Sequence, residues 1–228
     1  PNTPWYDGPS LLHHLEEVHI ASDRNLIDPR FPVQYEIRPQ SDDFHDYRGF
    51  AGTIAGGFFR EGDDVMVLPS GFTSKVKSIE TIDGPLDEAF APMSVTLRLE
   101  DEIDISRGDM ICRPHNHPTT SQDIDATVCW MNEAAALAPG RKYVLKHTTR
   151  TTKIIVKDLA YRLDINTLHR DEEATDLRLN EIGRITFRTQ QPLFFDEYRR
   201  NRETGSFILV DEVSNATVAA GMINGVAD

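Results

Sequence analysis

A glycine-rich stretch at residues 48–71 constrains the fold of this chain more than any other segment. Small and β-branched residues fill its first half, and glycines interrupt them at four positions. A polar turn at residues 60–63 then leads into an apolar run at residues 65–68. This pattern predicts two strands joined at a charged, glycine-containing turn. Glycines inside strands are typical of bulges and barrel corners, so we expect this hairpin to form the centre of a small β-barrel.

Length and composition narrow the class of protein. The chain has 228 residues, enough for one large or two modest domains. Its hydrophobic content of 39% and charged content of 27% are typical of soluble globular proteins. No apolar run approaches the roughly 20 residues that span a bilayer, and no signal peptide opens the chain. Two cysteines, Cys112 and Cys129, are too few for a disulfide scaffold, which favours the cytoplasm. The net charge of −13 argues against a broad phosphate-binding surface.

Residues 1–25 differ from the rest because they predict a helix. Asp7 is suited to cap this helix, and Pro9 to start it. Leucines at 11, 12 and 15 and a valine at 18 then recur at helical spacing. An amphipathic helix needs a surface to pack on. We interpret it either as the last helix of a domain upstream or as a linker helix that lies on the barrel.

From Phe31 onward, short alternating strands replace the helical pattern. In the first of them, Val33, Tyr35 and Ile37 share one face. Short strands with no substantial helix between them indicate a closed antiparallel barrel, which we place at residues 26–113. Besides the glycine-rich hairpin, its expected strands are residues 31–39, 73–79, 94–99 and 110–112, with loops at 40–46 and 82–91.

Two prolines and a polar run predict a linker at residues 114–120. A second set of strands follows it, and we assign residues 121–228 to a second barrel. The expected fold is therefore all-β, with two tandem antiparallel β-barrels and a short N-terminal helix. The expected strands of the second barrel are residues 124–130, 143–150, 152–159, 181–189, 207–210 and 217–223, with a long polar loop at 164–180.

Strand order, linker and turn chemistry together resemble domains two and three of the translation-factor GTPases of the elongation factor Tu type. The glycine-rich region before Phe58 carries this resemblance, with the segments REGDDVMVLPSG, ISRGDMICRP and RNRETGSFILVDEVSNATVAAGMI. Longer motifs resemble the large, GTP-hydrolysing subunit of bacterial sulfate adenylyltransferase. They run from Thr3 to Ile223 and include TPWYDGPSLLHHLEEVHI, RFPVQYEIRP, DYRGFAGTIAGG, YVLKHTTR and DINTLHRDEEATDLRLNEIGRI.

This resemblance implies a three-part protein in which a GTPase domain precedes two β-barrels. The chain lacks the Gly-x-x-x-x-Gly-Lys-[Ser/Thr] loop that holds nucleotide phosphates, and it lacks the switch and guanine-reading patterns in suitable contexts. We therefore expect a fragment with no catalytic, cofactor-binding or metal-binding residues, whose parent uses GTP and Mg²⁺. Its expected role is that of a scaffold that couples GTP hydrolysis to another reaction.

The resemblance also implies partners. In the family, a small subunit transfers the adenylyl group from ATP to sulfate, and some members continue into an adenylylsulfate kinase. We expect contacts with that subunit, with the parent's own GTPase domain and with such a kinase, but with no membrane and no nucleic acid. Two alternatives are a translation elongation factor fragment that binds aminoacylated RNA, and a stand-alone β-barrel unrelated to GTP. The acidic net charge and the closer motif match oppose the first.

A polar constellation at residues 146–150 is the best candidate binding surface in the second barrel. Lys146, His147 and Arg150 lie beside two threonines, a combination that suits a phosphate or a partner's carboxylate. The alternative is an ordinary strand with an outward polar face. By the resemblance, this segment matches the place where translation factors face their nucleotide domain. We therefore hypothesise that it contacts the absent GTPase domain.

Aromatic residues suggest two further contacts. The glycine-rich hairpin begins with Tyr47, Arg48 and Phe50. This cluster of aromatic and arginine side chains could anchor a binding partner, or it could equally well pack against the rim of its own barrel. Phe194 and Phe195 lie in a loop-like stretch. We expect them to pack between the barrels.

A metal site is disfavoured. Cys112, His115 and His117 bring soft and imidazole ligands together, but a metal site usually needs a fourth ligand, and the two histidines lie in a proline-flanked linker. A solvated linker is the simpler interpretation.

The remaining clusters of titratable residues favour structural explanations. His13 and His14 are adjacent on the expected helix and point about 100° apart, so they cannot share a face. Acidic clusters at residues 42–43, 63–64 and 171–173 fall in predicted turns or loops, where carboxylates are mostly solvated.

Overall fold

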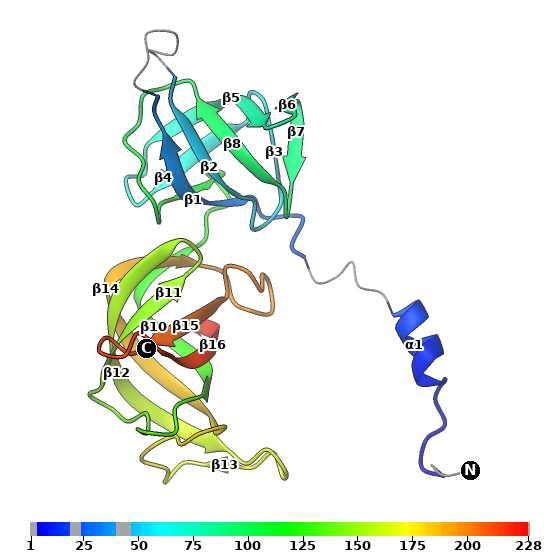
Figure 1. Cartoon of the computed structure of the whole chain (residues 1–228), viewed down its shortest axis with the longest axis vertical. Coiled ribbons are helices and arrows are strands. Elements are labelled where there is room, and N and C mark those ends of the chain that lie inside the picture. The colour runs from blue at the N-terminus through cyan, green and yellow to red at the C-terminus, as the bar shows by residue number, and fades with distance from the viewer. Residues whose placement is uncertain (1–3, 19–23, 40–46, 228) are drawn as a thin grey trace.

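The computed structural model describes residues 4–18, 24–39 and 47–227. Within them, a short helix is followed by strands, and Figure 1 shows these strands gathered into two barrels, one above the other. The predicted all-β fold of two tandem antiparallel barrels is confirmed. No helix in these ranges is long and apolar enough to cross a membrane. The elements are α1 (Leu11–Glu17), β1 (Arg30–Ile37), β2 (Gly49–Thr53), β3 (Phe58–Arg60), β4 (Asp64–Leu68), β5 (Thr73–Thr81), β6 (Gly84–Leu86), β7 (Glu88–Phe90), β8 (Ser94–Leu99), β9 (Met110–Cys112), β10 (Thr119–Trp130), β11 (Lys142–His147), β12 (Arg150–Leu163), β13 (Arg170–Asp171), β14 (Ile182–Phe195), β15 (Ser206–Val210) and β16 (Thr217–Val226).

The first barrel is a ring of six strands. In the order β4-β9-β1-β2-β8-β5 each strand is hydrogen-bonded to the next, and β4 pairs with β5 to close the ring. β6 continues from β5, while β3 and β7 pair as a separate two-stranded sheet. Because successive side chains alternate across a strand, Val65, Val76 and Leu97 point inward and are completely buried.

The predicted hairpin at residues 48–71 is wrong in its pairing. β2 is hydrogen-bonded to β1 and β8, whereas β4 is hydrogen-bonded to β9 and β5. Between them the chain turns at Gly57, where φ is +62° and a Cβ would lie 2.5 Å from the backbone nitrogen of Pro29. β3 then pairs with β7, inside the segment at 82–91 that was predicted to be a loop. The close approach to Pro29 thus coincides with the point where the chain leaves the sheet instead of folding straight back.

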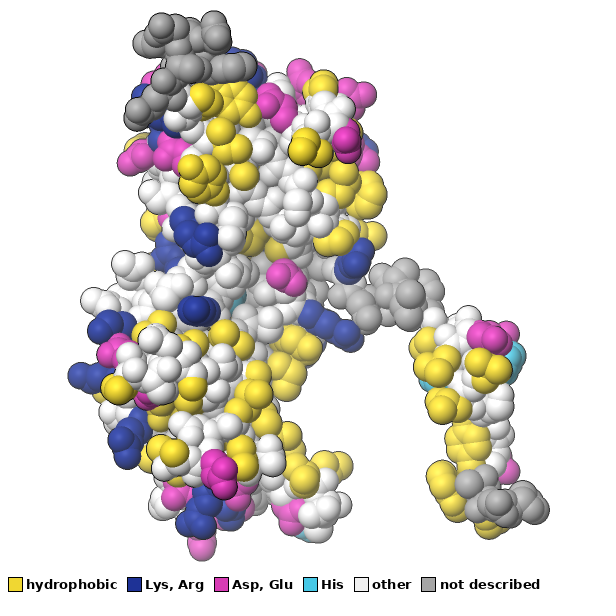
Figure 2. Space-filling model, viewed as in Figure 1, with side chains coloured by type: hydrophobic (Ala, Val, Ile, Leu, Met, Phe, Trp, Pro, Cys, Tyr) yellow, Lys and Arg dark blue, Asp and Glu magenta, His cyan; other side chains and the backbone are white. Residues whose placement is uncertain are grey.

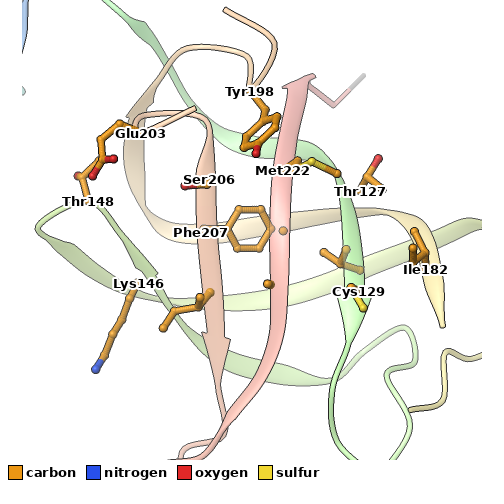
Figure 3. Close-up of a pocket in the computed structure, with 14 residues that line it drawn as sticks. Thr127, Cys129, Lys146, Thr148, Ile182, Tyr198, Glu203, Ser206, Phe207 and Met222 are labelled. Atoms are coloured by element: carbon orange, nitrogen blue, oxygen red, sulfur yellow. The ribbon is translucent and has the colours of Figure 1, made fainter. Parts of the chain in front are cut away.

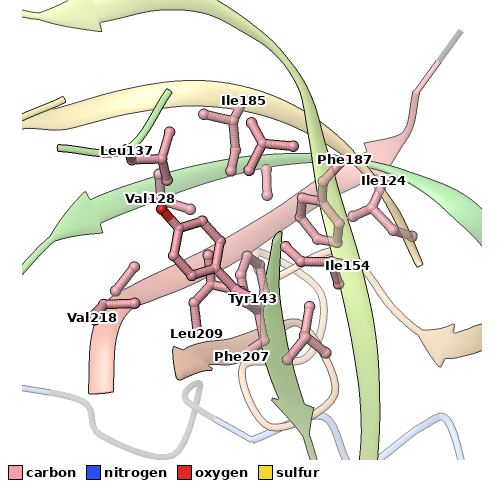
Figure 4. Packing of buried hydrophobic residues seen from close by; sticks show 14 of the residues in the cluster. Ile124, Val128, Leu137, Tyr143, Ile154, Ile185, Phe187, Phe207, Leu209 and Val218 are labelled. Atoms are coloured by element: carbon pink, nitrogen blue, oxygen red, sulfur yellow. The ribbon is translucent and has the colours of Figure 1, made fainter. Parts of the chain in front are cut away.

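The second barrel is also a ring of six strands. Its order is β11-β15-β16-β10-β14-β12, and the pairing of β11 with β12 closes it. Figure 4 shows its apolar core, in which the rings of Phe187 and Phe207 meet edge to face at 5.3 Å between centroids. Trp130 packs in the same way on Tyr143, and its indole N–H donates to the carbonyl oxygen of Ala135 at 2.7 Å. The largest buried side chain of this core therefore has its polar atom satisfied.

The strands of the second barrel extend further than their patterns predicted. β10 begins at Thr119, inside the predicted linker at residues 114–120. β14 runs on to Phe195, so the two adjacent phenylalanines lie in a strand and not in a loop. The predicted polar loop at 164–180 contains β13 and buries Leu177, which forms a β-bridge with Leu137. Backbone hydrogen bonds between neighbouring strands of the ring extend the strands into polar residues, where the alternation of apolar and polar residues did not predict a strand.

The helix α1 is capped by Ser10 and not by Asp7 as predicted. The Ser10 hydroxyl accepts a hydrogen bond from the backbone nitrogen of His13 at 3.3 Å. No residue of α1 is buried, and Leu11, Leu12 and Leu15 are all exposed. The described residues therefore do not cover its apolar face, and both interpretations of this helix stay predictions.

Charged side chains hold the two barrels together at what we call the inter-barrel joint, formed by Asp28, Arg30, Arg150, Asp196 and Arg200. Arg30 in β1 donates two hydrogen bonds to the Asp196 carboxylate, at 2.8 and 2.9 Å, and both side chains are buried. Arg200 donates two more to buried Asp28, at 2.8 and 2.9 Å. These hydrogen bonds hold the pKa of Asp28 well below its usual range.

Arg150 at the start of β12 makes the third charged contact of the joint. Its Nε donates to the carbonyl oxygen of Gly108 in the first barrel at 2.9 Å, and its Nη2 lies 3.3 Å from Asp109. Its guanidinium also lies over the ring of Phe194, at 4.5 Å from the centroid. One side chain of the second barrel thus contacts both the backbone and a carboxylate of the first.

A small apolar cluster completes the joint. Phe194 packs there with Met110 and Cys112 of the first barrel, as expected for a residue between the barrels. Phe195 points the other way, into the core of the second barrel, so the expectation for that residue is wrong. The alternation of β14 explains the difference, because neighbouring residues of a strand face opposite sides.

Candidate functional site

A groove on the outer face of the second barrel is the candidate site. It crosses β10, β16 and β15 and has a volume of about 680 Å³. Figure 3 shows Tyr198 next to Met222 at one end of this groove, while Lys146 extends away from the strands. Its walls are mostly apolar, and Lys146 and Glu203 supply opposite charges on its lining.

One row across the sheet forms the floor of the groove. Cys129 in β10 is opposite Ala220 in β16, Ala220 is opposite Ile208 in β15, and Ile208 is opposite Lys146 in β11. All four side chains point outward, because their neighbours in each strand are buried. The side chain of Ala220 is smaller than those of Cys129 and Ile208 on either side, so the row forms an apolar depression. It ends at the ammonium group of Lys146.

The packing beneath this floor depends on a glycine. Gly221 follows Ala220 in β16 and faces the barrel interior, where a Cβ would collide with the ring of Phe207. The missing side chain lets that ring fill the space directly under the groove, so floor and core are packed against each other.

The loop between β14 and β15 forms one wall of the groove. Tyr198 in this loop is held by a hydrogen bond from its backbone nitrogen to the carbonyl oxygen of Ile223, at 2.9 Å. In the same loop, the Asn201 side chain donates to the carbonyl oxygen of Ala55 in the first barrel at 3.0 Å. This contact therefore ties one wall of the groove to the first barrel.

The structure separates the three residues of the predicted constellation at 146–150. Lys146 is exposed beside the groove. His147 is buried, and its Nε2–H donates to the carbonyl oxygen of Thr204 at 2.7 Å, while burial lowers its pKa. Arg150 lies in the joint, where burial lowers its pKa but leaves it charged. Of these three, Lys146 is the residue that another domain can reach.

The first-barrel cluster favours rim packing over a binding anchor. The Tyr47 hydroxyl donates to Glu80 at 2.7 Å, and burial together with Glu80 raises the Tyr47 pKa to about 12. Arg48 is bound to Glu36 at 2.7 Å, and Phe50 is buried in the core. These three side chains are engaged within their own barrel.

The cysteine and histidines of the linker do not converge. Cys112 is completely buried, which raises the pKa of its thiol to about 12, while His115 is exposed. The Nδ1 of His117 lies 3.2 Å from the carbonyl oxygen of Pro118. Across residues 4–18, 24–39 and 47–227, no three His, Cys, Asp or Glu side chains are grouped as metal ligands.

In the two acidic clusters that the structure describes, ordinary ion pairs involve Asp63, Asp64 and Asp171, the last with Arg162 at 2.7 Å. Asp63 accepts a hydrogen bond from Arg113 at 3.1 Å, and Asp64 lies 3.2 Å from the ammonium of Lys75. The cluster at residues 42–43 lies outside the described residues. These contacts explain the carboxylates without catalysis.

Sequence patterns did not identify the groove. Its signal is weak, since Ile208 and Met222 are apolar at outward positions where the pattern expects polar residues. Such residues form a groove only when strands from distant parts of the chain lie side by side. An apolar floor with charged residues around it suits the binding of another protein surface more than catalysis.

Comparisons with known proteins agree with this architecture. Residues 123–224 match the family model described as GTP-eEF1A C-terminal domain-like. A solved structure of sup35 complexed with GMPPNP superposes with a TM-score of 0.79 over 99% of this chain and 54% of that one. Its sequence is 20% identical, so this likeness concerns the fold.

Sequence relatives are more specific. The chain is 60% identical over 221 residues to the Bifunctional enzyme CysN/CysC of Mycobacterium tuberculosis strain H37Rv, covering 97% of this chain and 36% of the relative. It is 49% identical to Sulfate adenylyltransferase subunit 1 of Bacteroides fragilis, covering 97% of this chain and 45% of the relative. The chain thus spans less than half of the length of these relatives. The chain is thus a sequence relative of sulfate adenylyltransferase subunit 1 and of CysN/CysC proteins over nearly its whole length.

Proposed function

We propose that these two barrels are the scaffold of the GTP-hydrolysing large subunit of a cytoplasmic sulfate adenylyltransferase. The enzyme would make adenylyl sulfate and diphosphate from ATP and sulfate, with a small subunit performing the adenylyl transfer. The observation that carries this proposal is the 60% identity to a CysN/CysC protein across 97% of the chain. The absence of a phosphate-binding loop from the sequence means that no residue here is assigned to GTP or Mg²⁺.

In this proposal, the groove receives the GTPase domain of the parent protein. Its apolar floor, with Ile208 and Met222, is the kind of surface that a neighbouring domain buries. Lys146, which the sequence had singled out for this contact, lies on its lining. The joint keeps the two barrels in one orientation, so a movement at the groove would be passed to both. A following adenylylsulfate kinase, as the name CysN/CysC suggests, is part of the proposal.

The test uses the full-length large subunit with its small subunit. Met222→Glu places a carboxylate on the groove at a side chain that is 40% exposed. We expect it to lower GTP-stimulated formation of diphosphate from ATP and sulfate about tenfold, because burying an unpaired charge weakens an interface strongly. The control is Val213→Glu, an apolar residue that is 91% exposed and not part of the groove.

Three results would count against the proposal. Equal activities of the two variants would remove the groove from the coupling. A full-length protein that releases no sulfate-dependent diphosphate with its small subunit would overturn the enzyme assignment itself. High-affinity binding of aminoacylated RNA at low salt would support the elongation-factor alternative instead.

A further inference from the structure

A second surface of the second barrel carries an unusual concentration of lysines. All four lysines of residues 121–228 lie on the β11–β12 hairpin, at positions 142, 146, 153 and 157. Each is exposed, and the alternating residues between them, such as Leu145 and Ile154, are buried in the core. Strand alternation therefore places all four ammonium groups on the outside of the barrel.

The charge of this hairpin is opposite to that of the chain. Residues 141–157 contain six Lys and Arg side chains and no Asp or Glu, whereas the chain as a whole has a net charge of −13. Figure 2 shows Lys and Arg side chains gathered along the side of the second barrel where Figure 1 labels β12 and β14. Arg188 of β14 lies opposite Ile155 in the sheet, but its guanidinium is ion-paired with Asp123, so the unpaired positive charge comes from the lysines.

Few carboxylates of the chain neutralise these lysines. Lys153 lies 3.0 Å from Glu212, and both side chains are largely exposed. Among the described residues, Lys142, Lys146 and Lys157 have no carboxylate within 4.0 Å. Like charges on neighbouring strands repel each other, so the hairpin retains an uncompensated positive field.

The lysines surround an apolar centre. Lys142 and Lys153, together with Arg188, line a shallow hollow of about 410 Å³ that also exposes part of Ile155. Val144, opposite Lys153, is likewise half-buried on this face. An apolar centre with a charged rim is the usual anatomy of a protein–protein interface.

We infer that this lysine face, defined by Lys142, Lys153 and Lys157 around Ile155, is the docking surface for the adenylyl-transferring small subunit. The inference rests on the proposed function. It requires a complementary surface on the small subunit, with Asp and Glu around an apolar side chain. A nucleic acid is a poorer occupant, because the net charge of −13 repels a long polyanion beyond the reach of the hairpin. The groove stays free for the GTPase domain, as the two surfaces have different linings.

The experiment compares two charge reversals in the full-length large subunit. The first is the triple variant Lys142→Glu, Lys153→Glu and Lys157→Glu, and the control is Lys75→Glu with Lys77→Glu on the first barrel, where both lysines are also exposed. The Kd for the purified small subunit is measured at 50 mM and 300 mM salt. We expect the triple variant to raise the Kd about thirtyfold or more at low salt and to remove the salt dependence of the wild type. The control should change the Kd less than about twofold.

The outcomes separate the two proposals. If the wild type binds the small subunit and the triple variant binds equally well, the inference is overturned while the proposed function stands. If the wild type does not bind the small subunit, the proposed function fails. Should the triple variant lose solubility, the neutral Lys→Gln triple replaces it, with an expected loss of about tenfold. Loss of transfer RNA binding in the triple variant, with unchanged binding of the small subunit, would assign the face to RNA and overturn the inference.

Discussion

The two barrels close with the same number of strands but in different orders. In the first barrel, the first strand β1 pairs with the next strand in sequence, β2, and with the last strand, β9. In the second, the first strand β10 pairs with β14 and β16. Strand lengths differ as well: β12 and β14 have 14 residues each, whereas β5, the longest strand of the first barrel, has 9. Longer strands give the second barrel a broader outer face, and both candidate surfaces lie on it.

The two barrels also differ in their net charge. Residues 26–113 contain seventeen acidic and nine basic side chains, whereas residues 121–228 contain sixteen acidic and fourteen basic ones. The first barrel therefore carries most of the negative charge, and the second combines an apolar groove with a lysine face. Under the proposed function, the two similar β-barrels divide their work: the first is an acidic support, and the second receives partners.

Breaking the joint is the strongest way to test whether the barrels act as one unit. Arg30→Ala leaves the buried Asp196 carboxylate without its guanidinium, and we expect it to cost about 3–5 kcal/mol of unfolding free energy. The control Arg48→Ala breaks the more exposed pair with Glu36 and should cost about 1 kcal/mol or less. Urea unfolding, followed in each barrel by a separate fluorophore, measures both values. Equal losses for the two variants would show that burial of the joint contributes nothing.

The second contact of the joint is expected to depend on pH. Asp28→Asn should destabilise the chain by about 1.5–3 kcal/mol at pH 7, because hydrogen bonds to a charged carboxylate are lost. The pKa of Asp28 is lower in the folded chain than in the unfolded chain, so its stabilisation is complete above the unfolded value of about 3.9 and is lost progressively as the pH falls from there through the folded value. Thermal unfolding of both proteins between pH 2 and pH 7 tests this. A difference that stays constant over the whole range would contradict the role of the carboxylate charge.

A smaller change tests the packing beneath the groove. Gly221→Ala forces the Phe207 ring to move, and we expect a loss of about 1–3 kcal/mol. Gly225→Ala lies in the same strand β16 and meets no atom within 4 Å, so it should stay within about 0.5 kcal/mol of the wild type. Denaturant titration of the two variants gives the comparison. An unchanged unfolding free energy for Gly221→Ala would mean that the Phe207 ring can move without cost and that the core below the groove is not tightly packed.

The two cysteines test the contrast between joint and groove without a large effect on stability. Cys112 is completely buried at the joint with a thiol pKa raised to about 12, whereas Cys129 is half-buried in the groove. We expect a thiol reagent at pH 8 to modify Cys129 first and Cys112 only after unfolding. Cys129→Ser should abolish the fast phase. In the full-length subunit, an unchanged rate at Cys129 would speak against a covered groove.

Local patterns were sufficient for the type of element but not for its partners. Alternation identified the strands that bury Val95, Leu97 and Ile185, because a strand with one buried face must repeat every two residues. The same reasoning joined β2 to β4 as a hairpin, which the structure contradicts. Pairing depends on residues far apart in sequence, such as Gly57 against Pro29, and no local window contains both.

The candidate site was still harder to predict. The sequence singled out residues 146–150 as one surface, but the structure assigns His147 to the interior and Arg150 to the joint. Lys146 remains beside a groove whose floor comes from β10, β15 and β16. The sequence does not distinguish a polar side chain that is exposed to solvent from one that binds a buried carbonyl group or contacts the neighbouring barrel.

Composition, alternation and motifs along the chain were enough to predict the all-β class, the two barrels and the kinship with sulfate adenylyltransferase large subunits. The order of strands in each ring, the buried Arg30–Asp196 pair and the positions of the groove and the lysine face became visible only in the folded chain. Burial and charge pairing are properties of segments that folding brings together in space. They arise once the rings have closed and the two barrels have packed on each other.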